Sequence, residues 1–412
     1  MSVFSNLNIL VAVTGGIAAY KACDVIRQCQ KLGAHRVKAL LSPSAAKFVT
    51  PLTFESLTRE AVMIDPFEND AHGTPTHIAA AQQFDVMVIV PATANTLAKL
   101  AGGLADNILT TTALTFTHKP VVVAPAANTR MWQNPATQRN IALLEAYGNY
   151  TIVPPDTGDL ACGESGEGKL APLDTLLLYI QQATHPYAGL LKGQRIVISA
   201  GGTQQPLDPV RYLGNHSSGK MGVALADECF AMGADVVLVH AQPGSLQRPY
   251  PIHHTPTVQA MADAVSQAFA TATGLIMAAA VSDYAPDQVA GHKLKKSGNQ
   301  ALTLTLTPTI DILKTMSATK TADQWTVGFA AETNDLAQNA QTKLVAKGCD
   351  MLVVNDVSRS DIGMGSDHNE VTLYLPNHEA ILVPKTSKSL IARQLLLRLA
   401  QHVLSKPLVT TP

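Results

Sequence analysis

The sequence contains no uninterrupted apolar run of the roughly 18 residues that a membrane-spanning helix requires. Its first residues, MSVFSNLNILVAV, lack the basic segment that precedes the apolar core of a secretory signal, and their apolar part is typical of a strand. We therefore expect a cytoplasmic protein that does not act at a membrane.

Neither sign of charge dominates the chain. Lys and Arg together number 30 and Asp and Glu 31, which gives a formal net charge of −1, and the basic residues are spread along the sequence. A protein that binds nucleic acid usually carries a basic patch or stripe. This composition therefore favours small-molecule partners over nucleic acid.

Cysteine is scarce, and no two of the five cysteines form a CxxC pair or a metal-type cluster. This spacing excludes a thiol-type zinc site, and a cytoplasmic location argues against disulfides. Four cysteines lie in apolar or helical surroundings and fit core packing: Cys23, Cys29, Cys229 and Cys349. Cys162 differs, because it lies in the Gly-rich and charged segment PDTGDLACGESGEGKLAP (155–172). Core packing does not explain a thiol in such a loop, which is typical of a flap over a site.

What the chain does contain is 46% apolar residues, enough for buried cores, arranged as short apolar runs alternating with helical patterns. The run NILVAV (8–13) leads into a double glycine and a helix, and RIVISA (195–200) repeats this theme after HPYAGLLKGQ (185–194). Alternating strands and helices indicate parallel, doubly wound sheets. We expect an α/β protein with two Rossmann-like, mostly parallel-sheet domains at residues 1–190 and 191–412.

Ligands of open α/β sheets bind beyond the carboxyl ends of the strands, so the turns after the predicted strands carry the candidate sites. TGGIAAYK (14–21) is a tight turn before a helix, where backbone N–H groups suit a phosphate. PATANT (91–96) and PAAN (125–128) each offer one amide, which can both donate to and accept from a flavin edge or a carboxylate. A turn asparagine is an equally good interpretation of Asn95 and Asn128 taken alone. A lone histidine such as His77 is more often structural than catalytic.

Together, GGIAAYK, HIAAA, PATANTLAKLAGGLADN, PAANTRMW and ACGESGEGKL resemble the flavin-dependent cysteine decarboxylase family, and phosphopantothenoylcysteine decarboxylases in particular. Ala127 stands where that family usually has Met. The resemblance implies a flavodoxin-like fold for residues 1–190 and a homo-oligomer, because flavin sites of this family form between subunits. It also implies FMN as cofactor, bound by Gly15, Gly16, Ser42, Thr93, Asn95, Asp106 and Asn107.

The same resemblance implies a reaction. FMN would oxidise the cysteinyl thiol of the substrate to a thioaldehyde, after which CO₂ leaves. The reduced flavin would then return the hydride, and an acid would protonate the enethiolate carbon. His77 would act as base or orienting group, Asn128 would hold the substrate carboxylate, and Cys162 would donate the proton.

In the second half, SAGGTQQPLDPVRYLGNHSSGKMG (199–222) resembles the phosphopantothenate–cysteine ligase family, and AAAVSDYAP, KLKK, GFAAET and NDVS extend the resemblance. Gln205 and Gly214 stand where the family often has an acid and Ser. The resemblance implies that CTP, with Mg²⁺ or Mn²⁺, activates 4′-phosphopantothenate as an acyl-cytidylate, which the amine of L-cysteine then attacks. It assigns nucleotide and substrate binding to Arg211, Asn215, Asp283, Lys293, Phe329, Lys343 and Lys347. Lys293 would stabilise the developing charge and Asn215 would take part in amide formation, whereas the metal ligands are left unassigned.

GNHSSGKM (214–221) also fits the phosphate-binding P-loop pattern, except that Met221 replaces the hydroxyl residue that binds Mg²⁺. A P-loop follows its strand directly, whereas residues 201–213, with Pro206 and Pro209, separate this stretch from the preceding strand. We therefore predict the end of a substrate loop, with a helix that begins at Lys220.

The favoured prediction joins both halves in two consecutive steps of coenzyme A biosynthesis, ending at 4′-phosphopantetheine. Two other classes of protein stay open at the level of sequence. One is a P-loop kinase or NTPase, which would prefer ATP and bind no flavin. The other is a nucleotide-binding regulatory or scaffold protein that keeps the fold without the chemistry. An FMN spectrum of the purified protein would reject the kinase hypothesis.

Overall fold

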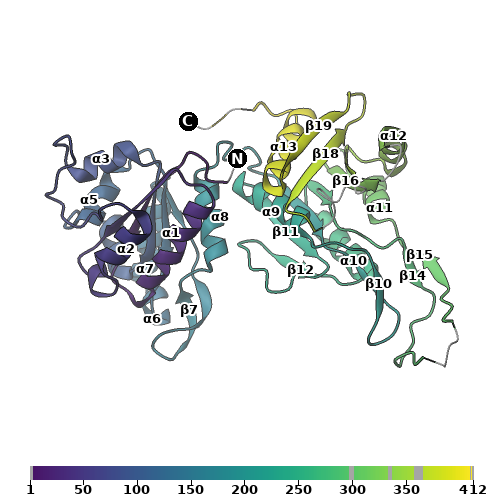
Figure 1. Ribbon diagram of the computed structural model, residues 1–412, viewed down its shortest axis with the longest axis horizontal. Helices are drawn as coiled ribbons and strands as arrows, with labels where there is room; N and C mark the ends of the chain where they lie inside the picture. Colours follow the sequence, from purple (N-terminus) through teal and green to yellow (C-terminus); the bar gives the residue numbers. More distant parts are fainter. Residues whose placement is uncertain (1–2, 297–300, 333–335, 357–364, 409, 411–412) are drawn as a thin grey trace. The chain divides into compact units, whose positions relative to one another are not determined.

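The computed structural model describes residues 3–296, 301–332, 336–356, 365–408 and 410. The chain divides into two compact units, Met1–His185 and Pro186–Pro412. Each unit contains its own central sheet with helices on both faces (Figure 1).

The sheet of the first unit is parallel throughout and has, among the described residues, the strand order β2-β1-β3-β4-β5. A parallel sheet covered on both faces needs strands that are apolar at nearly every position, as these are. This strand order is the flavodoxin-like one, which confirms the predicted fold. The strands are β1 (Asn8–Val13), β2 (Arg36–Leu41), β3 (Val86–Ala92), β4 (Val121–Pro125) and β5 (Tyr150–Ile152).

Alternate residues of β1 enter two separate cores in this unit. Ile9 and Val11 pack with α1 (Ala22–Lys31), α2 (Pro51–Thr58) and α8 (Leu173–Ala183). Leu10 and Ala12 point to the opposite face of the sheet. The helices on that face are α3 (Thr76–Gln83), α4 (Ala94–Ala101), α5 (Ile108–Thr115) and α7 (Pro135–Ala146). Short helical turns complete the unit: η1 (Ile17–Lys21), η2 (Ala45–Lys47) and α6 (Thr129–Trp132).

Two local features differ in detail from the sequence-based expectation. The stretch after Gly16 begins as the 3₁₀ turn η1, in which Ala19 N–H bonds Gly16 O at 2.9 Å, and α1 starts only at Ala22. The Gly-rich flap is an antiparallel hairpin of β6 (Asp156–Asp159) and β7 (Ser165–Lys169) with Cys162 in its turn. Gly163 has φ +83° in that turn, a backbone conformation that favours glycine.

In the described part of the second unit the main sheet has eight strands in the order β12-β11-β8-β13-β16-β17-β18-β19. The pairs from β12 to β17 are parallel, and β18 and β19 extend the sheet antiparallel, which confirms a mostly parallel sheet. The strands are β8 (Arg195–Ala200), β11 (Asp235–His240), β12 (Ile252–His254), β13 (Gly274–Met277), β16 (Trp325–Glu332), β17 (Met351–Asp356), β18 (His368–Tyr374) and β19 (Ile381–Ser387).

Strand β8 again divides its residues between two cores. Ile196 and Ile198 pack with α9 (Lys220–Ala231) and α13 (Lys388–His402), so the C-terminal helix packs on the sheet. Val197 packs with α10 (Val258–Phe269), α11 (Ile312–Thr319) and α12 (Leu336–Lys347). Two small hairpins lie outside the main sheet: β9 (Gln204–Pro206) with β10 (Tyr212–Gly214), and β14 (Tyr284–Pro286) with β15 (Leu306–Pro308).

Strand order reverses once in each parallel sheet, between β1 and β3 and between β8 and β13. Crevices at such points are the usual ligand sites of open α/β sheets. Most of the residues predicted from the sequence lie in the segments that follow these strands.

Candidate active sites

Thr14 connects the carboxyl end of β1 to that of β3 by hydrogen bonds. Its buried Oγ1 donates to the Pro91 carbonyl at 2.6 Å and accepts from the Thr93 N–H at 3.1 Å. The turn after β2 packs on the same place, because a Cβ on Gly15 would lie 2.3 Å from the Cβ of Ser44. The structure therefore brings together four residues predicted to bind flavin: Gly15, Gly16, Ser42 and Thr93.

This junction is rich in groups that can donate hydrogen bonds to a phosphate. Gly16 precedes the first residue of η1, and Thr93 caps α4, its Oγ1 accepting from the Thr96 N–H at 3.3 Å. Ser42 follows β2 and is held by a bond from its N–H to the Val13 carbonyl at 3.0 Å. Hydroxyl groups, small residues and helix starts in one place suit an anion.

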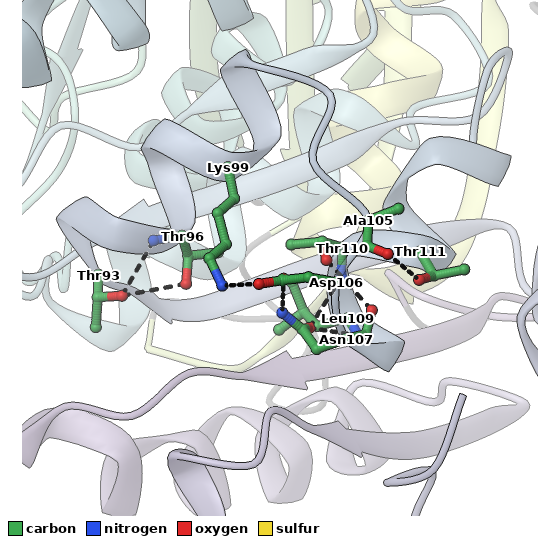
Figure 2. A network of polar contacts seen from close by, with 9 residues as sticks. All are labelled: Thr93, Thr96, Lys99, Ala105, Asp106, Asn107, Leu109, Thr110 and Thr111. Carbon is green, nitrogen blue, oxygen red and sulfur yellow. Dashed lines mark hydrogen bonds and ion pairs between the residues drawn. The ribbon is translucent and has the colours of Figure 1, made fainter. Parts of the chain in front are cut away.

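Asp106 and Asn107 belong to a polar network before α5, shown in Figure 2. Lys99 Nζ lies 2.5 Å from Asp106 Oδ2, and Asn107 Nδ2 donates to Asp106 Oδ1 at 2.8 Å. The hydrogen bond from Lys99 lowers the pKa of Asp106, so this carboxyl stays ionised at neutral pH. Asn107 Oδ1 caps α5 by accepting from the Leu109 and Thr110 N–H groups. Both predicted flavin-binding residues thus also stabilise the fold locally, and Asn95 is exposed in the first turn of α4.

The β6–β7 hairpin is fixed to the loop that carries Asn128. The Ala127 N–H donates to the Gly168 carbonyl at 2.9 Å, and Thr129 Oγ1 donates to the Glu167 carbonyl at 2.7 Å. A Cβ on Gly168 would lie 2.3 Å from the Ala127 oxygen, so this close approach requires glycine. The hairpin and the Asn128 loop therefore form one local structure.

Asn128 connects this loop to Cys162. Its Oδ1 caps α6 by accepting from the Arg130 N–H at 2.9 Å, which leaves Nδ2 directed toward the hairpin. Nδ2 donates to Cys162 Sγ at 3.2 Å and to Glu164 Oε2 at 3.0 Å. Cys162 itself is exposed. Two residues predicted as catalytic, Asn128 and Cys162, are thus in direct contact.

Glu164 completes this cluster, and the sequence analysis did not identify it. The Cys162 thiol can donate to Glu164 Oε2 over 3.8 Å, and Arg130 Nη2 lies 3.4 Å from Glu164 Oε1. The hydrogen bond from Asn128, followed by the charge of Arg130, lowers the pKa of Glu164. Glu164 is only two positions from Cys162, so its proximity in sequence was a signal that could have been used.

His77 is not linked to that cluster by any hydrogen bond within the described ranges. It is the second residue of α3, and its backbone carbonyl accepts from Thr115 Oγ1 at 3.1 Å. Its Nδ1 is buried and has no partner among the described residues. A buried nitrogen without a partner is unfavourable, so a ligand that supplied one would be stabilised.

In the second unit a cavity of about 570 Å³ lies beyond the carboxyl ends of β13 and β16, next to the start of α9. Segments from several elements line it, including the loop 278–283 that follows β13 and the residues 217–222 at the start of α9. Five residues predicted to bind nucleotide or substrate are among its lining residues: Asn215, Asp283, Phe329, Lys343 and Lys347.

Lysine side chains give this cavity a cationic lining. Lys220 Nζ lies 2.6 Å from Asp367 Oδ1, and Lys347 is ion-paired with Asp311, which caps α11. Burial, followed by the nearby charge of Lys220, lowers the pKa of Lys388. A cavity with several cationic groups suits a polyphosphate or carboxylate ligand. Lys388 and Asp311 were missed by the sequence analysis, because only the fold brings α11 and α13 to this place.

The stretch 214–221 does not have the geometry of a P-loop. The β9–β10 hairpin lies between β8 and α9, whereas a P-loop joins its strand directly to its helix. Gly219, with φ +72°, precedes α9, and Lys220 begins the helix as predicted. Asn215 Nδ2 donates to the Val281 carbonyl at 3.0 Å, which fixes its amide beside the loop after β13.

Arg211 and Lys293 are not among the residues that line the cavity. Arg211 is engaged by Asp208, whose Oδ2 accepts from Arg211 Nε at 3.0 Å and from Nη2 at 2.6 Å. The same Nη2 donates to the Leu294 carbonyl at 2.5 Å. Lys293 is exposed beside Leu294. Their predicted roles in substrate binding and activation stay predictions.

Two further observations concern the described residues as a whole. They contain no group of three or more His, Cys, Asp or Glu side chains arranged to hold a metal ion. They also include no helix that is both long and apolar enough to span a membrane.

The fold and the two sites define a two-unit α/β protein, with a flavodoxin-like unit that carries an amide–thiol pair and a second unit with a cationic cavity. Family models match each unit separately: "Flavoprotein" matches residues 3–185, and "DNA/pantothenate metabolism flavoprotein C-terminal domain" matches residues 191–403. The chain belongs to the family of the bifunctional proteins of coenzyme A biosynthesis, which confirms the family and the enzyme class predicted from the sequence.

Individual relatives match nearly the whole chain. The coenzyme A biosynthesis bifunctional protein CoaBC of Bacillus subtilis (strain 168) is 40% identical over 400 residues, which cover 96% of this chain and 97% of the relative. The protein of that name from Mycobacterium tuberculosis (strain H37Rv) is 42% identical over 363 residues, 85% of this chain and 86% of the relative. The crystal structure of the C-terminal domain of a CoaBC protein is 35% identical and covers 53% of this chain and 100% of that chain, with a TM-score of 0.45.

Proposed function

We propose that this chain catalyses two consecutive steps of coenzyme A biosynthesis. The first is CTP-dependent ligation of cysteine to 4′-phosphopantothenate, and the second is FMN-dependent decarboxylation of the product to 4′-phosphopantetheine. The observation that carries the proposal is the similarity to bifunctional relatives over 96% of the chain. We assign the decarboxylase to residues 1–190 and the ligase to residues 191–412, because each half has its own candidate site.

The ligase reaction needs an activated carboxyl group, since a carboxylate is a poor acyl donor and CMP is a good leaving group. The lysine-lined cavity of the second unit supports this step, because cationic groups hold phosphates. Lys343 and Lys347 would hold the CTP phosphates, and Phe329 and Asp283 lie in the same lining. Mg²⁺ or Mn²⁺ would be held mainly by the phosphates, as is usual for Mg²⁺ in nucleotide sites.

Two residues would act directly on the activated carboxyl group. The amide of Asn215, fixed by the Val281 carbonyl, would hold the acyl-cytidylate while the cysteine amine attacks. Lys293 would stabilise the negative charge on the α-phosphate, and Arg211 would contact the substrate or hold the segment beside Lys293.

The residues of the first unit fit FMN. Gly15, Gly16, Ser42 and Thr93 converge at the strand-order reversal and would hold the phosphate, whereas Asn95, Asp106 and Asn107 would lie along the rest of the cofactor. When bound, FMN supplies the two-electron oxidation of the substrate thiol that makes loss of CO₂ possible.

The protein's own side chains orient the substrate and move the proton. Asn128 Nδ2 points at the hairpin and can donate to the substrate carboxylate. Cys162 would give its proton to the product carbon. His77, whose Nδ1 is buried without a partner among the described residues, would act as base or orient the substrate. The β6–β7 hairpin would limit the access of water.

We also propose a homo-oligomer that works in the cytoplasm on small-molecule substrates. Ile17 and Tyr20 lie in η1, which follows Gly16, and are 62% and 57% exposed, and Leu52 in α2 is 69% exposed. Exposed apolar side chains next to a ligand site support an interface between subunits.

The test is product analysis. The purified protein is incubated with 4′-phosphopantothenate, L-cysteine, CTP and Mg²⁺, and products are identified by mass spectrometry. We expect 4′-phosphopantothenoylcysteine and then 4′-phosphopantetheine, together with an FMN absorption spectrum. A protein with nucleotide binding but neither product would favour the regulatory or scaffold hypothesis.

A further inference from the structure

Glu164 is the acceptor that Asn128 and Cys162 share. Its Oε2 lies 3.0 Å from Asn128 Nδ2 and 3.8 Å from Cys162 Sγ. We propose that Glu164 is a positioning residue for Cys162 in the protonation step of the decarboxylase reaction, and that it returns a proton to the sulfur after each turnover. This inference rests on the proposed function of the first unit.

The turn of the hairpin fixes Glu164 beside Cys162. The Leu160 N–H donates to the Glu164 carbonyl at 2.9 Å, and the Gly163 N–H donates to the Leu160 carbonyl at 3.0 Å. These two bonds close a tight turn that contains Cys162. The turn thus holds Cys162 and Glu164 on one short loop, where their side chains are in contact.

Asn128 fixes the same carboxylate from the other side. Because Asn128 Oδ1 already accepts from the Arg130 N–H, the amide cannot turn without losing its cap on α6. Its Nδ2 thus remains a donor toward both Sγ and Oε2. The three side chains form a closed triangle of contacts.

The ion pair with Arg130 explains the position of the Glu164 side chain less well than the contacts with Asn128 and Cys162 do. Its nitrogen–oxygen distance is 3.4 Å, and the two side chains are 86% and 48% exposed. Exposed ion pairs of this kind contribute little, because water and salt screen them. The contacts with Asn128 and Cys162 are the specific ones.

The proton balance defines the role of Glu164. When Cys162 protonates the product carbon, its S–H bond breaks, a C–H bond forms, and the sulfur is left with a negative charge. Glu164, which is half exposed, takes a proton from water at Oε2 and passes it to Sγ, so an O–H bond breaks and the S–H bond is restored. No oxidant or other reactant is needed for this return.

Glu164→Gln keeps the size and one acceptor oxygen, but it replaces the other oxygen with an NH₂ group and cannot carry the proton. We expect normal CO₂ release in a single turnover, and formation of 4′-phosphopantetheine over repeated turnovers slowed by about 10²-fold, the usual contribution of a general acid–base group. The oxidised enethiol should accumulate. Glu164→Asp should recover part of the rate. The matched control is Glu167→Gln on the same hairpin. It should give the same ratio of 4′-phosphopantetheine to oxidised enethiol as the unsubstituted protein.

A second measurement does not depend on turnover. Alkylation of Cys162 by iodoacetamide is followed by mass spectrometry of the full chain as a function of pH. The loss of a negative charge about 4 Å from sulfur should make alkylation at neutral pH about fivefold faster in Glu164→Gln, and not in Glu167→Gln. An unchanged alkylation rate overturns the proposed contact.

The ratio of 4′-phosphopantetheine to oxidised enethiol tests the role of Glu164 in returning the proton. If Glu164→Gln gives the same ratio of 4′-phosphopantetheine to oxidised enethiol as the unsubstituted protein, the proposal is overturned, whatever the alkylation rate. If the unsubstituted protein makes no product at all, the proposed function fails. In that case alkylation that is faster in Glu164→Gln but not in Glu167→Gln still supports Glu164 as the positioning residue of Cys162.

Discussion

Leu294 donates its backbone N–H to the buried carboxylate of Asp208 at 3.0 Å. Arg211 binds that carboxylate and also donates to the Leu294 carbonyl, so the pair holds both polar groups of the Leu294 backbone. The hydrogen bonds from Arg211, followed by those from backbone N–H groups, hold the pKa of Asp208 far below its usual range. The Asp208–Arg211 pair therefore fixes the segment that carries Lys293.

We predict that Asp208→Asn loosens this segment. Hydrogen bonds to a charged group contribute about 1.5–3 kcal/mol, so exchange of the Leu294 amide hydrogen should become about tenfold faster or more. Ligase activity should fall while decarboxylase activity is kept. Hydrogen exchange measures the mobility of the segment, and separate assays of the ligase and decarboxylase reactions measure the two activities. Asp287→Asn, at an exposed carboxylate near the same segment, is the control, and equal effects in both variants would contradict the assignment.

Lys293→Gln tests the residue that this segment carries. If Lys293 stabilises charge on the α-phosphate, cytidylate formation should fall by about 10²-fold, the scale of losing one electrostatic stabiliser. Single-turnover pyrophosphate release measures this step. Decarboxylation of supplied 4′-phosphopantothenoylcysteine should stay near normal, and a parallel loss of both activities would indicate a folding defect instead.

Cys162→Ser tests the proton donor. The hydroxyl keeps a hydrogen-bonding group near Asn128 but is a much weaker acid than a thiol. We expect FMN to stay bound and reducible by substrate, with accumulation of the oxidised enethiol instead of 4′-phosphopantetheine. Mass spectrometry of the products decides, and normal turnover by the Ser variant would remove Cys162 from this role.

His240 predicts a pH dependence of stability in the second unit. It is 3% exposed, and a Cβ on Gly219 would lie 2.3 Å from its Nε2, so it packs against the turn that starts α9. Burial, followed by the charge of His254, lowers the pKa of His240. The folded state thus favours neutral imidazole, and the unfolded chain binds more protons near pH 6.

The stability from neutral His240 is therefore present above about pH 6.5 and is lost as the pH falls toward the lowered pKa of the folded state. We expect the urea midpoint of the second unit to be lower at pH 5.5 than at pH 7.5. His240→Gln should show a smaller change between these pH values. A midpoint equally sensitive to pH in both proteins would assign the effect to other groups.

The sequence was sufficient for the elements that depend on local pattern. NILVAV and RIVISA coincide with β1 and β8 because a strand buried on both faces is apolar at nearly every position. Lys220 begins α9 as expected. The family resemblance added Asn128 and Cys162 as candidate catalytic residues, and the structure shows their side chains in contact.

Contacts that span long distances in sequence could not be predicted in this way. The bond between Asp208 and Leu294 joins two hairpin regions 86 residues apart, and the ion pair of Lys220 with Asp367 spans 147 residues. No periodicity or spacing in the sequence links the two residues of either pair. For the same reason, the sequence could not show that Arg211 is bound by Asp208.

The P-loop-like stretch 214–221 contains Lys220 and Met221, whose substitution separates the two interpretations of this segment. In a P-loop, Lys220 would bridge the nucleotide phosphates, and its loss would abolish nucleotide use. Here Lys220 begins a helix and pairs with Asp367, both side chains being more than half exposed. Such a pair contributes little to stability. We therefore expect Lys220→Ala to bind CTP with only modestly reduced affinity, and Met221→Ser to bring no gain in activity.

Asn215 should be the more sensitive position. Its Nδ2 donates to the Val281 carbonyl, and Asp at this site would lose that donor and place a negative charge beside both a carbonyl oxygen and the substrate phosphates. Asn215→Asp should thus impair conversion of the acyl-cytidylate to the amide more than Lys220→Ala impairs CTP binding. CTP affinity and single-turnover formation of pyrophosphate and amide, measured for the three variants, compare them directly. Loss of CTP binding in Lys220→Ala alone, with natural behaviour of Asn215→Asp, would restore the P-loop interpretation, because only a phosphate-bridging lysine explains that pattern.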